Sequence, residues 1–229
     1  MKKRVLEIIY QDEYLVAINK PNGLMVHRSR IAADADEFAL QLLRDQIGQH
    51  VFPIHRLDRK TSGVLLFGLN KEVVQLMQKE FLNFKVEKKY MAIVRGFFPE
   101  EIEVDYDLTN DRNKTQSAIT FFQKINQSEL PIPLGKHQTS RYSLIEAFPK
   151  TGRQHQIRKH LNHLRHPIIG DRPHGCNKQN KLFKEKWQMQ TMLLHAKSLM
   201  IKHPFQNKKL ELIADLNPEF LRIKKELQL

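Results

Sequence analysis

The chain has 229 residues with an ordinary globular balance, 41% hydrophobic and 28% charged, which allows one large domain or two small ones with a substantial core. Its 38 Lys and Arg residues outnumber 25 Asp and Glu residues, and the net charge of +13 favours a polyanionic partner, most commonly nucleic acid. The single cysteine, Cys176, excludes an internal disulfide, and no run approaches the ~20 apolar residues of a membrane span, so we expect a soluble cytoplasmic protein.

The first third of the chain predicts two strands, a helix and a buried strand. Apolar residues at 5–10 and 14–19 are typical of short strands joined by a polar turn. Helical spacing predicts a helix over about 36–47, and the apolar run 64–67 is typical of a buried strand. Asn70 can cap a second helix. One face of that helix is apolar and carries Val73, Met77, Phe81 and Phe84.

Strands dominate the middle of the chain. Residues 89–95 alternate between apolar and polar positions, and 102–108, 117–123 and 140–148 are further candidate strands. The polar segment 124–139 is the best candidate for a variable surface loop.

The last third predicts two more helices and two strands. A helix is expected over 153–165, strands over 192–202 and 209–213, and a final helix capped by Asn217 and started by Pro218. Because the strands are mostly not separated by regular helices, the pattern predicts an α+β fold. We expect a single domain over 1–229 with a mixed, mostly antiparallel sheet flanked by helices.

Several familiar site patterns are missing from the chain. Neither GxGxxG, GxxxxGK[ST], GxSxG nor HExxH occurs, which argues against dinucleotide, Walker-type phosphate, hydrolase and zincin sites of those designs. His160 and His163 share a helical face and could bind a metal in principle, but no acidic residue interleaves with them. Histidines on a basic helix more often serve structure or RNA contact, so we predict no metal site.

Residues 55–63 (HRLDRKTSG) concentrate polar and charged groups directly before a buried strand. Asp58 lies between Arg56 and Arg59, and nearby positive charge favours an ionised carboxylate. An ionised carboxylate fixed beside a strand end can act as nucleophile, base or metal ligand. Taken alone, the pattern is better explained by a salt bridge within the loop.

Two further segments carry candidate functional groups. Tyr90 starts the strand at 89–95 and can stack on a base, although a core tyrosine is the simpler interpretation in isolation. Residues 151–158 (TGRQHQIR) place a glycine turn before a helix that carries two arginines and a histidine. Arg153 and helix N-terminal amides suit phosphate, whereas Arg158 can pair with a carboxylate.

Together these segments resemble a known family. HRLDxxTSG is similar to the catalytic motif of the RluA-type pseudouridine synthases, and TGRQHQIR is similar to their third motif. Asn19-Lys20-Pro21 with Gly23 resembles their first motif, and residues 193–204 their closing strand. The resemblance extends from about Leu6 to Ala214. It implies a pseudouridine synthase catalytic domain with a central catalytic cleft, no N-terminal S4-like RNA-binding domain, and no cofactor.

The resemblance also implies roles for individual residues. Asp58 is the expected nucleophile or base, Arg158 its salt-bridge partner, and Tyr90 the residue that stacks on the uracil. Arg56 is the candidate for filling the gap left by a flipped base, with a brace for Asp58 as the alternative. Further candidate RNA contacts are His55, Lys88, Lys89, Arg153, Lys159 and Arg165. A lysine run from Lys178 to Lys186 either adds to them or forms a solvated helix face.

Four segments resemble the subgroup that modifies uridine 65 in the T-stem of certain tRNAs: residues 10–13, 26–29, 45–50 and 163–171. One position departs from this subgroup: Lys60 stands where we expect a proline. A proline at that position would stiffen the loop after the nucleophile. We therefore expect a monomer that isomerises uridine 65 of tRNA. The alternatives are the same chemistry at another tRNA or ribosomal RNA uridine, and a non-catalytic RNA-binding or folding factor.

Overall fold

The computed structural model describes residues 4–27 and 37–229, and the chain forms two compact units. Unit 1 comprises residues up to Lys88 together with Ala196–Asp215, and unit 2 comprises Lys89–His195 together with Leu216–Leu229. Residues 28, 29 and 36, which belong to two of the sequence predictions, lie outside the described residues. The prediction of a single domain stays a prediction.

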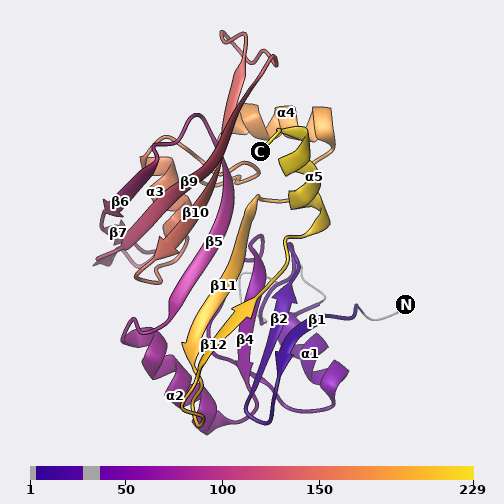
Figure 1. The fold of residues 1–229 in the computed structure, drawn as a ribbon, viewed down its shortest axis with the longest axis vertical. Helices are drawn as coiled ribbons and strands as arrows, with labels where there is room; N and C mark the ends of the chain where they lie inside the picture. Colours follow the sequence, from indigo (N-terminus) through magenta and orange to yellow (C-terminus); the bar gives the residue numbers. More distant parts are fainter. Residues whose placement is uncertain (1–3, 28–36) are drawn as a thin grey trace. The chain divides into compact units, whose positions relative to one another are not determined.

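Unit 1 is built on a sheet in which the hydrogen-bonded order is β1-β2-β4-β11. The pairs β1–β2 and β2–β4 are antiparallel, as are β3–β4 and β11–β12. The predicted strands at 5–10, 14–19, 64–67, 192–202 and 209–213 are confirmed (Figure 1). Their bounds are β1 Glu7–Gln11, β2 Leu15–Lys20, β3 Phe52–Pro53, β4 Ser62–Gly68, β11 Leu194–Lys202 and β12 Lys209–Ile213.

Two helices belong to unit 1, α1 (Ala39–Ile47) and α2 (Lys71–Leu82). Asn70 caps α2 as predicted, because its side chain accepts a hydrogen bond from the Val73 N–H at 2.9 Å. Val73 and Met77 of α2 are fully buried in a core cluster with residues of β2, β4, β11 and β12. The helix therefore packs its apolar face on the unit 1 sheet.

One residue on the predicted apolar face of α2 was placed wrongly. Phe84 lies beyond the helix end, has a left-handed φ of 57°, and is 58% exposed. Since α2 ends at Leu82 with Asn83 at its C-cap, the helical spacing that put Phe84 in line with Phe81 no longer applies.

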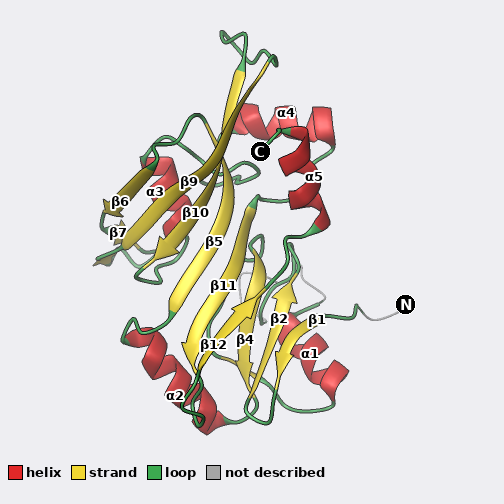
Figure 2. Ribbon diagram, in the orientation of Figure 1, coloured by secondary structure: helices red, strands yellow, loops and turns green. Residues whose placement is uncertain are grey.

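Unit 2 contains a second antiparallel strand series in the order β5-β10-β9-β6 (Figure 2). The predicted segment 124–139 is not one loop: β9 continues to Leu130, and only the following residues form the turn into β10. Residues 126–130 pair in register with 140–144, so partner-strand hydrogen bonds keep this polar sequence extended. The strand bounds are β5 Glu87–Arg95, β6 Glu101–Asp105, β7 Leu108–Thr109, β8 Thr115–Gln116, β9 Ile119–Leu130 and β10 Ser140–Pro149.

Three helices complete unit 2: α3 (Gln156–His163), α4 (Asn177–Trp187) and α5 (Pro218–Glu226). The α3 helix starts later than predicted because His155 has a left-handed φ of 57°, so Arg153 and His155 precede the helix. Asn217 caps α5 as predicted and accepts from the Phe220 N–H at 2.9 Å.

Alternating residues of the unit 2 strands face two different apolar clusters. Ala92 and Val94 of β5 join Ile157 and Leu161 of α3 in one cluster. Ile93 of β5 joins residues of α4 and α5 in the other. Because neighbouring residues of a strand point to opposite faces, α3 covers one face of these strands and α4 with α5 cover the other. The predicted α+β class is confirmed.

Candidate active site

Asp58 lies in unit 1 on the short loop between β3 and β4, and its side chain is half-buried. The loop is a tight turn, since the Asp58 carbonyl accepts from the Thr61 N–H at 3.1 Å. Thr61 and Ser62 after it are buried. The carboxylate is thus carried by a short, internally bonded segment joined directly to a buried strand.

Gly63 allows this loop to approach β11 closely. A Cβ on Gly63 would lie 2.2 Å from the Ala196 carbonyl oxygen, a separation that no side chain tolerates, and its φ of +107° also favours glycine. The TSG part of the motif therefore has a packing reason: the loop that carries Asp58 ends where two backbones nearly touch.

The side chain of Lys20, at the end of β2, forms a hydrogen bond to the same loop. Its ammonium is fully buried and donates to the carbonyls of Pro21 at 3.0 Å, Leu24 at 2.8 Å and Arg59 at 3.2 Å. Burial lowers the pKa of Lys20 from 10.5 to about 7, and the negative charge of Asp58 opposes that shift. A positive group close enough to interact with Asp58 is therefore built into the scaffold of unit 1.

The turn after β2 is bonded to the residues that follow Asp58. The Asn22 amide donates to the Lys60 carbonyl at 2.6 Å, and the Gly23 N–H donates to the Arg59 carbonyl at 2.8 Å. Arg59 returns a bond from its Nε to the Gly23 carbonyl at 3.1 Å. The turn at Asn22-Gly23 and the Asp58 loop thus form one hydrogen-bonded unit, and they do so with Lys60 at the position where a proline was expected.

The two residues before Leu57 differ in their surroundings. His55 stacks on Phe81 at a centroid distance of 5.1 Å, and its Nε2 accepts from the Leu66 N–H at 3.1 Å. Burial, with the charge of Lys88 adding to it, lowers the pKa of His55 to about 4, so the ring is neutral at pH 7. Arg56 is exposed. His55 therefore braces the loop, whereas Arg56 points its charge to solvent.

The other two catalytic candidates lie in unit 2. Tyr90 is half-buried on β5, opposite Ala147 of β10, and packs against the core cluster that includes Ile157. Arg158 is 5% exposed on α3 and forms a two-point ion pair with Asp171: Nε to Oδ2 at 2.7 Å and Nη2 to Oδ1 at 2.8 Å. The orientation of the guanidinium plane is thereby fixed.

Asp171 holds this ion pair in place although sequence analysis gave it no role. Burial works to raise the pKa of Asp171, but the hydrogen bond and charge of Arg158 outweigh it and the net shift is downward. Its carbonyl also accepts from the Asn180 amide at 2.6 Å. The signal available in the sequence was Gly170-Asp171 directly after an apolar run, a pattern too common to single out.

A histidine pair lies next to this ion pair. His155 Nδ1 and His174 Nε2 are 2.9 Å apart, and the His174 N–H donates to Asp171 Oδ1 at 3.3 Å. Burial, together with the charge of Arg158 and opposed by Asp171, lowers the pKa of His174. One ring of the pair donates and the other accepts, so the two histidines link the residue before α3 to the segment after Asp171.

The chain is also similar in sequence and in structure to known proteins. The RNA pseudouridylate synthase family matches residues 14–163, more than half of the chain. This chain belongs to that family. It is therefore a pseudouridine synthase, an isomerase that converts uridine in RNA to pseudouridine.

Curated relatives match over nearly the whole length. Proteins named tRNA pseudouridine synthase C are 48% identical in Vibrio cholerae, covering 93% of this chain and 92% of the relative, and 48% identical in Haemophilus ducreyi, covering 94% and 93%. The structure of human RNA Pseudouridylate Synthase Domain Containing 4 is 25% identical, with a TM-score of 0.75 over 97% of this chain and 93% of that one. The fold class predicted from the family resemblance is thus confirmed.

The remaining candidate RNA contacts of this pseudouridine synthase are spread over unit 2 and the end of unit 1. Arg153 donates from Nε to the Ser117 carbonyl at 2.9 Å, and Lys159 donates to the Thr109 carbonyl at 3.0 Å. Lys89 lies 3.4 Å from Glu146, while Arg165 is exposed and Lys88 half-buried. Their contact with RNA stays a prediction.

The two helical histidines have structural partners. His160 is fully buried, and its ring nitrogens lie 3.0 Å from Thr120 Oγ1 and 3.1 Å from the Tyr106 carbonyl. His163 stacks on Tyr106 at 4.0 Å. Within residues 4–27 and 37–229, no group of three potential ligands could hold a metal ion, and no helix is long and apolar enough to cross a membrane.

Proposed function

We propose that this pseudouridine synthase acts on tRNA and isomerises uridine 65 in the T-stem. The observation that carries the substrate class is the match of more than 90% of the chain to relatives named tRNA pseudouridine synthase C. The position follows from the resemblance of four segments to the uridine-65 subgroup. The net charge of +13 suits a polyanionic substrate. We further propose that the protein works as a monomer in the cytoplasm, without a cofactor.

Asp58 is the catalytic nucleophile or base in this proposal. Lys20 and the Asn22-Gly23 turn hold the backbone on the C-terminal side of Asp58 through the carbonyls of Arg59 and Lys60. A reacting group gains most from being fixed before the substrate arrives, because no free energy is then needed to order it during the reaction. This rigid loop supports a role in which the Asp58 carboxylate meets one defined atom of the nucleoside.

Tyr90 and Arg158 complete the proposed catalytic set. Tyr90 stacks on the uracil, and Arg158 stabilises the Asp58 carboxylate as an ion. The two-point contact with Asp171 supports the second role, since it fixes the orientation of the Arg158 guanidinium.

Arg56 assists base flipping. A uridine inside a stem is inaccessible while stacked, and extruding it costs a few kcal/mol. The exposed Arg56 side chain lies two residues from Asp58 and can occupy the space that the flipped base leaves. A planar guanidinium stacks well between bases, which supports this assignment.

The experiment that tests the proposal uses Asp58→Asn, which removes the charge with little change of shape. Pseudouridines are mapped in total RNA from cells that lack the protein and carry either the wild-type chain or this variant. We expect pseudouridine at tRNA position 65 only with the wild type. Modification at position 65 by the variant would exclude Asp58 as the catalytic group, and modification at another site alone would move the target.

A further inference from the structure

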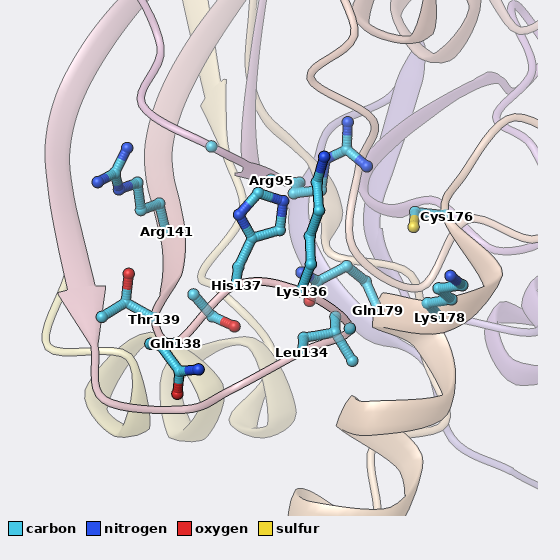
Figure 3. Close-up of a pocket in the computed structure, with 13 residues that line it drawn as sticks. Arg95, Leu134, Lys136, His137, Gln138, Thr139, Arg141, Cys176, Lys178 and Gln179 are labelled. Atoms are coloured by element: carbon cyan, nitrogen blue, oxygen red, sulfur yellow. The ribbon is translucent and has the colours of Figure 1, made fainter.

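A strongly basic pocket lies in unit 2 and is not part of the proposed catalytic set. It has a volume of about 820 Å³ and is lined by three segments: the end of β5 at Arg95, the turn and strand residues 134–141, and the start of α4 at Cys176 to Gln179. Figure 3 shows the labelled side chains of these segments around the pocket.

Positive charge in this pocket is only partly compensated. Arg95, Lys136, Arg141 and Lys178 line it, and none of its lining residues is Asp or Glu. Arg141 pairs with Glu129 at 3.0 Å. In the part of the chain that the structure describes, the other three have no carboxylate within 4.0 Å. Cations that line one pocket without a paired carboxylate attract an anion, so these side chains favour anion binding there.

The geometry suits an anion that reaches the pocket from solvent. Lys136 and Lys178 are exposed, so their ammonium groups can adjust to a ligand. Arg95 is half-buried and oriented, because its Nη2 donates to the Arg165 carbonyl at 3.1 Å. An oriented guanidinium beside two adjustable ammonium groups is well suited to phosphate oxygens.

The position along β5 separates this pocket from the base that reacts. Arg95 is five residues beyond Tyr90 on the same strand, and strands rise about 3.3 Å per residue, so the two lie roughly 17 Å apart. Several nucleotides span such a distance. A phosphate held here therefore belongs to a part of the RNA away from the target uridine.

We propose that this pocket binds the phosphodiester backbone of the RNA substrate away from the target nucleotide. The identity of the RNA rests on the proposed function, whereas the phosphate contact is inferred from the residues that line the pocket. Such a contact carries no base specificity, but it fixes the register of the substrate on the enzyme.

The test compares two pairs of neutralising substitutions in the full-length protein. Lys136→Gln with Lys178→Gln removes two charges from the pocket. Lys208→Gln with Lys209→Gln removes two charges from exposed positions at and directly before the start of β12, which do not line the pocket and are not candidate RNA contacts. Filter binding of full-length tRNA is measured against salt concentration, with Asp58→Asn as the common background to prevent turnover.

We expect the pocket pair to weaken tRNA binding about tenfold at moderate salt and to lower the slope of log K against log salt by about 1 to 2, since each lost phosphate contact lowers it by about 0.7 to 0.9. The control pair should change the slope by less than about 0.5. An unchanged slope with the pocket pair, or equal changes with both pairs, would overturn the proposal.

Inorganic phosphate distinguishes RNA backbone from a free anion. If 10 mM phosphate raises the melting temperature of the wild type but not of the pocket pair, while tRNA binding is the same for both, the pocket is a small-anion site and the proposal is wrong. Since these assays measure binding, they are independent of whether position 65 is the target. If RNA from cells with the wild-type chain carries no pseudouridine at position 65, while the pocket pair lowers the salt slope as expected, only the proposed function is contradicted.

Discussion

Replacing Lys20 with Met tests whether a buried charge holds the Asp58 loop. The change keeps an unbranched side chain that is one atom shorter, but it removes a donor shared by three carbonyls, those of Pro21, Leu24 and Arg59. The Arg59 carbonyl keeps its bond from the Gly23 N–H, whereas the Pro21 and Leu24 carbonyls lose the Lys20 donor. Each buried carbonyl left without its partner costs about 1 to 3 kcal/mol, so these hydrogen bonds contribute a few kcal/mol. The free-energy cost of burying the ammonium group opposes this stabilisation.

The pKa of Lys20 sets the size and sign of that cost. Burial lowers the pKa from 10.5 to about 7, which corresponds to a penalty on the order of 5 kcal/mol for the charged form. Because the folded pKa lies below the unfolded one, the unfolded chain binds more proton between these values. Stability from this group is therefore fully present above pH 10.5 and is lost as the pH falls through about 7.

The free energy of unfolding should accordingly depend on pH in the wild type more than in the variant. The Lys20→Met protein should be clearly less stable at pH 9.5, and the gap should shrink by about 3 kcal/mol on going to pH 7. Urea denaturation followed by circular dichroism measures the free energy of unfolding of the two proteins at each pH. Lys202→Met, at an exposed lysine of unit 1, is the matched control and should show a gap that does not change with pH.

A direct titration gives the decisive result. Nitrogen NMR of labelled lysine should show one amine that titrates near pH 7 and disappears in Lys20→Met. In Asp58→Asn that amine should titrate still lower, because the opposing negative charge of Asp58 is gone. A Lys20 amine that titrates near 10.5, or a stability gap that is constant from pH 7 to 9.5, would refute the reasoning.

Three further substitutions probe the scaffold and the flipping role. Gly63→Ala should destabilise unit 1 by about 3 kcal/mol or more in urea denaturation, because its Cβ would meet the Ala196 carbonyl at 2.2 Å; a loss under about 1 kcal/mol would contradict the close approach. Asp171→Asn should cost roughly 3 to 5 kcal/mol and reduce turnover, since it removes the carboxylate of the buried ion pair that orients Arg158; full activity in a tritium-release assay would remove its positioning role. Arg56→Ala should slow modification of a paired stem more than of a short unpaired RNA, and equal losses on both would argue against gap filling.

Local signals in the sequence determined most elements and the family. Asn70 and the Asn217-Pro218 pair marked helix starts correctly because capping depends on a few neighbouring residues. The HRLDxxTSG and TGRQHQIR segments, together with the Asn19-Lys20-Pro21 turn, indicated the family, since the residue types and their order can be read along the chain. Where local signals failed, a distant partner decided: the polar residues 126–130 are strand only because β10 lies beside them.

Only the tertiary structure decided which charges are buried together. Nothing around Lys20 in the sequence indicates that its ammonium binds the carbonyl of Arg59, 39 residues away, or that Asp171 fixes Arg158. Likewise, the basic pocket unites Arg95, Lys136 and Lys178 from segments that are far apart along the chain. Electrostatic interactions depend on distance and burial, and both are properties of the folded chain, whereas residue order alone specifies neither.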